Sequence, residues 1–220
     1  MLKIKSLYVS FVKEYFTLNN INLELSPSEK LVIIGSKDSG RSALLRTIVG
    51  LEAIAKGEIL IKNMPLSRID FESDVELGYV PANPAFLEKK TVVENIEYIV
   101  KLRNENKNFI NAKVQNALNE YGLSFIRNKK VKELNYFDRL KLALARLSTR
   151  NIELLLIDDI FVTLSTMEKE KAIKLIKNLV KSQGCATLIM VNTQEVASMI
   201  GYKTKYLDYG SLSDDLPTEE

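Results

Sequence analysis

The sequence of 220 residues contains no histidine and only one cysteine, Cys185. Without histidine, the chain lacks the commonest general base and the commonest metal ligand of enzymes. One cysteine excludes a disulfide within the chain and a zinc site built from several thiolates. No apolar run approaches ~18 residues, the length that a membrane-spanning helix needs. The formal net charge of +3 does not create a field that demands a nucleic-acid partner. These absences favour a cytoplasmic protein in a reducing environment.

Apolar residues make up 46% of the chain, which is typical of a globular protein. This length suffices for one compact domain with a sizeable core, with or without a small inserted subdomain. The first residues, MLKIKSLYVSF, alternate between apolar and polar side chains as in a strand, unlike a signal peptide.

Short apolar runs without alternation occupy residues 77–80, 154–157 and 186–191. Such runs are typical of parallel strands buried on both faces. Helical patterns lie between them, so we predict an α/β core whose parallel sheet is covered by helices on both faces. The alternating segments before residue 62 predict an N-terminal antiparallel β layer beside this sheet.

The segment from about 88 to 148 is charged, is rich in helical patterns and has no convincing strand. We predict that it forms an inserted helical lobe, and that residues 1–87 and 149–220 form the core of the same single domain. Ser165 and Glu168 predict a capping box that opens a helix over residues 166–182.

The stretch GSKDSGRSALL, which begins at Gly35, has the outline of the phosphate-binding loop G-x-x-x-x-G-K-[ST]. It follows a short apolar run and precedes a helical segment, which is the context that this motif needs. However, Arg41 stands where lysine belongs, so the match alone is also compatible with chance. The candidate phosphate-binding residues are Gly35, Ser36, Lys37, Asp38, Ser39, Gly40, Arg41, Ser42 and Ala43.

A second motif follows the apolar run at 154–157, which ends in Asp158 and Asp159. In a Walker B motif the first acid binds Mg²⁺ and the second polarises the attacking water. Two acids after a strand are also common in ordinary loops, but the two motifs in this order are less readily explained by chance. The candidate Mg²⁺ ligands are Ser42 and Asp158.

The segment at 134–161, LNYFDRLKLALARLSTRNIELLLIDDIF, resembles the part of ATP-binding cassette (ABC) ATPases that joins the signature motif to Walker B. Residues 77–96 resemble the Q-loop of that family, and residues 187–212 resemble its switch strand and closing strands. The resemblance covers nearly the whole chain in the right order. It implies a P-loop NTPase fold, ATP and Mg²⁺ as ligands, and a head-to-tail dimer that usually powers a membrane transporter.

Compared with the family pattern, most catalytic positions carry other residues. Asp159 stands at the position of the general base, Thr193 at that of the switch histidine, and Ala82 at that of the Q-loop glutamine. The signature segment consists of Leu134, Asn135, Tyr136, Phe137 and Asp138. It lacks the family's serine and glycines, so we expect Tyr136 and Phe137 to block close approach to a partner's nucleotide.

The phosphate-binding loop also differs from the family pattern in charge. Asp38 replaces a glycine, and its carboxylate would repel a triphosphate by roughly 1–4 kcal/mol. An arginine at position 41 cannot make the compact contact of a lysine ammonium. Asp38 and Arg41 are alternatively expected to pair with each other and fill the site. The aromatic residue that stacks on adenine in this family is expected near residues 11–16, where Phe11, Val12, Tyr15 and Phe16 leave it unassigned.

We therefore predict a degenerate ABC nucleotide-binding domain with negligible ATPase activity of its own and weak or absent binding of ATP and Mg²⁺. Its expected partners are another ABC nucleotide-binding domain, in a heterodimer, and transmembrane transporter subunits, with no nucleic acid. The expected location is cytoplasmic, on the inner face of the membrane, with the lobe and residues 84–90 touching the membrane subunit. Two alternatives are a slow but genuine transporter ATPase and a soluble family member in a non-transport assembly. The sequence does not indicate a transported substrate.

Overall fold

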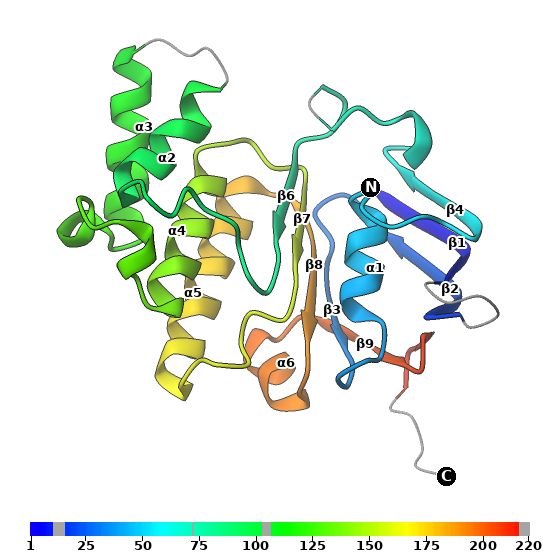
Figure 1. Cartoon of the computed structure of the whole chain (residues 1–220). Coiled ribbons are helices and arrows are strands. Elements are labelled where there is room, and N and C mark those ends of the chain that lie inside the picture. Colours follow the sequence, from blue (N-terminus) through cyan, green and yellow to red (C-terminus); the bar gives the residue numbers. More distant parts are fainter. Residues whose placement is uncertain (11–15, 72, 103–106, 216–220) are drawn as a thin grey trace.

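The computed structural model describes residues 1–10, 16–71, 73–102 and 107–215, and its elements form two sheets and a set of helices (Figure 1). The first sheet contains β1 (Leu2–Val9), β2 (Leu18–Leu25), β4 (Lys56–Ile61) and β5 (Met64–Pro65). The second contains β3 (Lys30–Ile34), β6 (Leu77–Val80), β7 (Leu154–Ile157), β8 (Ala186–Val191), β9 (Lys203–Asp208) and β10 (Ser211–Ser213). The α-helices are α1 (Arg41–Ile48), α2 (Val92–Lys101), α3 (Lys107–Glu120), α4 (Tyr136–Ser148), α5 (Thr166–Gln183) and α6 (Gln194–Ile200).

The second sheet has the strand order β10-β9-β3-β8-β7-β6. Its strands from β9 to β6 pair in parallel, and only β10 pairs antiparallel, with β9. The first sheet, in the order β2-β1-β4-β5, is antiparallel throughout. The predicted parallel core and the predicted N-terminal antiparallel layer are therefore both confirmed.

Each central strand buries side chains on both faces, because helices or the first sheet cover each face. In β3, Leu31 and Ile33 join the core cluster that contains α1 and the first sheet. The intervening Val32 and Ile34 join the cluster on the other face, which contains α4, α5 and α6. Helix α1 thus lies between the two sheets, as Figure 1 shows. This double burial explains why β3, β7 and β8 read as mainly apolar runs.

Helices α2 and α3 stand together away from the sheet, and α4 leads from them back to α5 (Figure 1). Helix α2 begins with a capping box in which Glu94 accepts hydrogen bonds from Thr91. Within the described part of 88–148, the β pairing is limited to an isolated bridge between Thr91 and Lys130. The connecting segment is tied to α4, since both amino groups of Arg139 donate to the Glu88 carboxylate at 2.7 Å.

Helix α5 starts where its capping box predicted. The Glu168 backbone N–H donates to Ser165 Oγ, and the Ser165 backbone N–H donates to Glu168 Oε2 at 2.9 Å. The apolar stripe of this helix is buried at Ile173, Ile176 and Leu179. Over the stretches that the structure describes, no helix combines the length and apolar character that crossing a bilayer requires.

Candidate functional site

Four segments that follow parallel strands meet at one edge of the second sheet. Carboxyl ends of parallel strands share an edge, and ligands of α/β proteins bind outside that edge. Gly35 follows β3, Ala82 lies two residues beyond β6, and Asp158 and Asp159 follow β7 directly. Thr193 lies two residues beyond β8. The structure therefore brings the predicted phosphate-binding loop, both acids and the residues at the Q-loop and switch positions to the same edge.

The loop between β3 and α1 depends on glycine at both of its ends. The Gly35 N–H donates to the Val191 carbonyl at 3.1 Å, and a Cβ here would lie 2.7 Å from the Leu207 carbonyl oxygen. Gly40 has a φ of 100°, and a Cβ there would lie 2.7 Å from a methyl group of Leu18. Each contact is too close for a side chain, so the backbone takes a path that only glycine permits at these positions.

Helix α1 begins at Arg41, directly after Gly40, and its N-terminus is suited to an anion. No side chain caps this end, and its first turn contains no acidic residue. The first N–H groups of a helix have no partner within the helix, and the helix dipole favours negative charge there. A phosphate group is a typical ligand of such an end.

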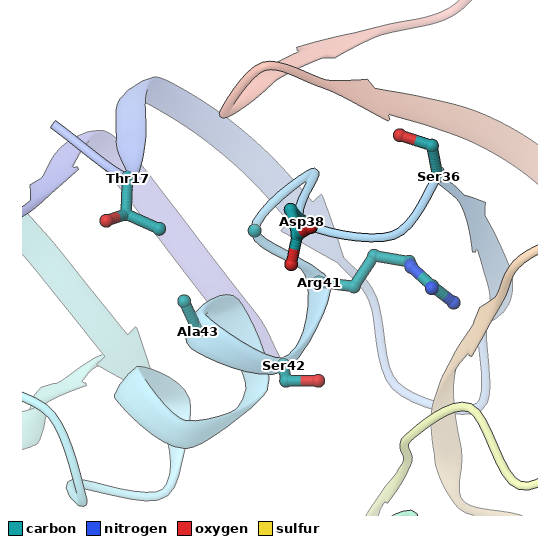
Figure 2. A pocket seen from close by; sticks show the side chains of 7 residues that line it. Thr17, Ser36, Asp38, Arg41, Ser42 and Ala43 are labelled. Atoms are coloured by element: carbon teal, nitrogen blue, oxygen red, sulfur yellow. The ribbon is translucent and has the colours of Figure 1, made fainter.

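A cavity of 310 Å³ opens over the loop and this helix end. Its lining consists of Thr17, Ser36, Asp38, Gly40, Arg41, Ser42 and Ala43. In Figure 2 the Arg41 side chain extends away from Thr17, which lies on the opposite side of the loop. Asp38 has a φ of 67°, a left-handed conformation that Asp tolerates better than most residues and that glycine adopts freely. The loop thus keeps a glycine-like backbone at position 38, while the Asp38 carboxylate adds a negative charge to the lining of the cavity.

The guanidinium of Arg41 is bound to a carboxylate that follows β7, which is separated from β3 by β8 in the sheet. Its Nη1 donates to Asp159 Oδ2 at 2.7 Å, and the two side chains are only 10% and 12% exposed. Burial raises the pKa of Asp159 above its ordinary value, while Arg41 opposes that shift. The expected alternative, a pair between Asp38 and Arg41, is therefore wrong: β7 places Asp159 against the guanidinium instead.

Three buried polar atoms around this pair lack hydrogen-bond partners within the described residues. They are Ser39 Oγ, Arg41 Nε and Asp159 Oδ1. Buried polar atoms normally have a partner, so exceptions mark places where a ligand or water completes the structure. The loop backbone fits a phosphate group, and the charge of Arg41, which stands at the lysine position of the motif, is already paired with Asp159.

Magnesium would depend on oxygen atoms that a nucleotide supplies. Ser42 and Asp158 offer a hydroxyl and a carboxylate, which are ligands that Mg²⁺ prefers. In the described part of the chain there is no cluster of three or more acidic, cysteine or histidine side chains that would bind a metal. Asp158 is buried, and its Oδ1 accepts the backbone N–H of Asp159 at 2.9 Å. Two protein oxygens fit the usual sites in which Mg²⁺ is shared with phosphate groups.

The Tyr136 side chain turns into its own domain. Its hydroxyl donates to the Ala82 carbonyl at 2.9 Å and also lies 3.2 Å from the Ile160 carbonyl. Burial, together with the negative charges of Asp159 and Asp158, raises the pKa of this hydroxyl to about 12. Tyr136 thus joins the first turn of α4 to the loops that follow β6 and β7.

The rest of the signature segment serves the start of α4. Asn135 is the N-cap, and its Oδ1 accepts the Asp138 N–H at 2.8 Å. Phe137 is partly buried, with the Lys141 ammonium 5.3 Å from its ring centre. Lys141 also pairs with Asp138 at 2.6 Å. Whether Phe137 and Tyr136 obstruct a partner's nucleotide stays a prediction, but Tyr136 makes its polar contacts inward.

Thr193 has a structural function at the switch position. It is the N-cap of α6, and its Oγ1 accepts the Val196 N–H at 3.4 Å. Threonine has no charge at any accessible pH, so it cannot act as a cationic sensor of phosphate.

The candidates for adenine stacking at 11–15 lie outside the described residues. Phe16 is described, and its ring packs edge-on against Tyr8 with 5.1 Å between ring centres. It does not line the cavity, whereas the adjacent Thr17 does. Thr17 was not predicted, and its position directly after the expected adenine-binding segment is the only sequence signal for it.

The comparison with known families settles the relationship of the chain. A sequence model of the family described as ABC transporter matches residues 18–162. The chain belongs to the ABC transporter family. The match contains the phosphate-binding loop, the signature segment and both acids, so the family assignment and the expected P-loop NTPase fold are confirmed.

Named import ATP-binding proteins align with nearly the whole chain. The molybdate/tungstate import ATP-binding protein WtpC of Pyrococcus horikoshii is 27% identical over 212 residues, which cover 96% of this chain and 61% of that protein. The methionine import ATP-binding protein MetN of Clostridioides difficile is 26% identical over 207 residues, covering 92% and 64%. The chain thus spans less than two thirds of the length of these relatives.

Solved ABC structures have the same fold. A dimeric, post-hydrolysis state of the ATP-binding cassette MJ0796, bound to ADP and Pi, superposes with a TM-score of 0.81 at 23% identity, over 96% of this chain and 95% of that chain. CbiO1 from Clostridium perfringens gives a TM-score of 0.84 at 19% identity, over 97% and 88%. At these identities the likeness establishes the fold alone.

Proposed function

We propose that this chain is an ATP-binding subunit of an ABC transporter whose own nucleotide site does not catalyse hydrolysis. It would act as a scaffold, coupling or regulatory subunit beside a partner ATPase and membrane subunits. Relatives such as WtpC and MetN are named import ATP-binding proteins, which supports a transport role. The observation that carries the non-catalytic part of the proposal is the buried pair between Arg41 and Asp159.

A general base must be within hydrogen-bond reach of the water from which it takes a proton. Asp159 stands at the base position of the family, but one of its oxygens is held by Arg41 at 2.7 Å. Freeing it would leave two buried charges without partners, which typically costs about 3–5 kcal/mol. The pair therefore removes the base and the loop cation from the reaction together.

The other altered positions support the same conclusion. Ala82 has no polar side chain, and its carbonyl accepts from Tyr136. At the switch position, the Thr193 hydroxyl is already used to cap α6. General acid–base groups contribute about 10²–10⁴-fold each. Several such losses in one site reduce turnover to a negligible level.

A partner domain follows from how ABC sites are composed. In this family each site combines the phosphate-binding loop of one domain with the signature segment of the other. Two copies of this chain would form two sites in which both halves are altered. A heterodimer with a competent ATPase would retain intact catalytic residues on the partner, working under the altered signature segment of this chain. We therefore favour a heterodimer over a homodimer.

A groove of 350 Å³ between the core and the lobe offers a surface for a membrane subunit. Leu77 and Pro84 form its core side, Ile99 comes from α2, Arg146 comes from α4, and Arg150 lies two residues beyond the end of α4. Arg150 already pairs with Glu76 at 3.2 Å, so the apolar walls and the charge of Arg146 are the features that suit an amphipathic cytoplasmic segment. This surface includes Pro84 and Ala85 from the predicted contact segment at 84–90, which supports the proposal that this segment contacts a membrane subunit.

Two measurements test this proposal. The purified chain, assayed alone, should release negligible phosphate from ATP. Its rate should be negligible in comparison with that of its partner ATPase. Affinity purification of tagged chain from native membranes should recover a second ATP-binding protein and a membrane subunit. Recovery of only a monomer or homodimer would contradict the transporter assignment.

The slow transporter ATPase remains the second candidate, because a carboxylate still stands at position 159 and Ser42 and Asp158 are retained. Phosphate release that disappears in Asp159→Ala would favour that candidate over a non-catalytic site. The matched control is Asp214→Asn, which removes an exposed carboxylate paired with Lys205.

A further inference from the structure

The two parts of the phosphate-binding loop are in different states. In such loops the backbone N–H groups hold the α- and β-phosphates, while the cationic side chain reaches the β- and γ-phosphates. Here the backbone part is intact, since Gly35 and Gly40 keep their constrained paths and the end of α1 carries no cap. The cationic part is not free, because Arg41 is bound to Asp159.

The shape of the cavity agrees with this division. Its lining extends from Thr17 to Arg41 and includes the first residues of α1, but neither Asp158 nor Asp159 contributes to it. Arg41 thus lines the cavity, and its guanidinium is turned to Asp159 with 2.7 Å between the bonded atoms. Any phosphate beyond the reach of the loop amides meets a cation that is already neutralised and a buried carboxylate behind it.

We propose that this site selects nucleoside diphosphates over nucleoside triphosphates, with the pair of Arg41 and Asp159 as the determinant. This inference rests on the proposed function, in which the loop is a nucleotide site without hydrolysis. A diphosphate uses the loop amides and leaves the pair closed. A triphosphate either separates the pair or places its terminal charge against Asp159. One unfavourable charge a few ångströms away changes the binding affinity by more than about tenfold at an effective dielectric of 20.

Isothermal titration of the full chain with ADP and with ATP, each with and without Mg²⁺, tests the selection. The expected result is at least about tenfold tighter binding of ADP. In Asp159→Asn the side chain loses its charge and binds Arg41 less strongly, so ATP affinity should rise until the two nucleotides differ by less than about threefold. Asp214→Asn, the matched loss of an exposed carboxylate, should leave the ratio unchanged.

Equal affinity of the unchanged chain for the two nucleotides, or a ratio unaffected by Asp159→Asn, would overturn the selection. So would the absence of any binding at millimolar ADP, although that result leaves the non-catalytic assignment intact. Conversely, ATP turnover with tighter ADP binding would contradict the proposed function and keep the selection.

A second variant guards against misfolding of the first. Arg41→Met combined with Asp159→Leu replaces the whole pair with apolar side chains of similar size, which folds usually tolerate. ADP affinity should remain within about threefold of the original, because the loop amides bind the diphosphate. A tenfold loss of ADP affinity in this variant would show that Arg41 binds the ligand directly and would overturn the inference.

Discussion

Removal of one hydroxyl, in Tyr136→Phe, tests how the first turn of α4 is held to the core. The hydroxyl has one proton, which it donates to the Ala82 carbonyl at 2.9 Å with the Ile160 carbonyl at 3.2 Å. A net hydrogen bond contributes about 0.5–1.5 kcal/mol, and a buried acceptor left without a donor costs about 1–3 kcal/mol. We therefore expect a loss of about 1–3 kcal/mol in the free energy of unfolding. For a chain of this size the melting temperature falls by about 2–4 °C per kcal/mol.

Thermal unfolding of the variant beside the unchanged chain measures this loss. The matched control is Tyr206→Phe, because the Tyr206 hydroxyl donates to the exposed Gln194 side chain at 3.1 Å. Its effect should stay within about 0.5 kcal/mol. Equal melting temperatures for the two variants would refute the reasoning that Tyr136 fastens α4 to the core.

The pH dependence gives a second readout for the same variant. Burial raises the pKa of Tyr136 from the ordinary value near 10 to about 12 in the folded chain. The unfolded tyrosine therefore ionises first as the pH rises. The stability advantage of the unchanged chain over Tyr136→Phe should be fully present below pH 10 and decline between about pH 10 and 12.

Three further outcomes are expected. Phosphate release by the purified chain should be negligible and unaltered by Asp159→Ala. Turnover at a rate typical of the family, if Asp159→Ala abolished it, would contradict this expectation. Asp38→Gly with Arg41→Lys should tighten ATP binding in calorimetric titration, because the change removes one carboxylate and restores a compact cation, and micromolar ATP binding by the unchanged chain would argue against this. Ser165→Ala should destabilise the fold by about 0.5–2 kcal/mol in thermal unfolding through loss of the α5 cap. Since Ser165 lowers the pKa of Glu168, the capping contribution should be present above the ordinary glutamate pKa and fade as the pH falls below it, and an effect independent of pH would count against the capping box.

The fold was predictable because its signals are local. A strand that is buried on both faces is mainly apolar, and the runs at 77–80, 154–157 and 186–191 coincide with β6, β7 and β8. The capping box of Ser165 and Glu168 fixed the start of α5 from four consecutive residues. Such features depend on neighbours in the chain, so the sequence is enough to recognise them.

The side-chain partners were not predictable because they depend on distant residues. Asp38 is three residues from Arg41, and Asp159 is 118 residues away, yet the distant carboxylate is the partner. The outcome depends on the distance between the ends of β3 and β7 in the sheet, which pattern reasoning does not give. The inward direction of Tyr136 likewise depends on how α4 lies against the core.

The altered site residues differ from simple losses, because several of them now make bonds that the fold uses. Arg41 keeps a buried carboxylate paired, and Thr193 caps α6. Tyr136 supplies a donor to the loop after β6, where Ala82 offers only its backbone. A group that is bound in the resting fold is unavailable to a ligand unless that bond is broken. The residues at this edge of the sheet therefore stabilise their own domain, while the first turn of α1 has no side-chain cap.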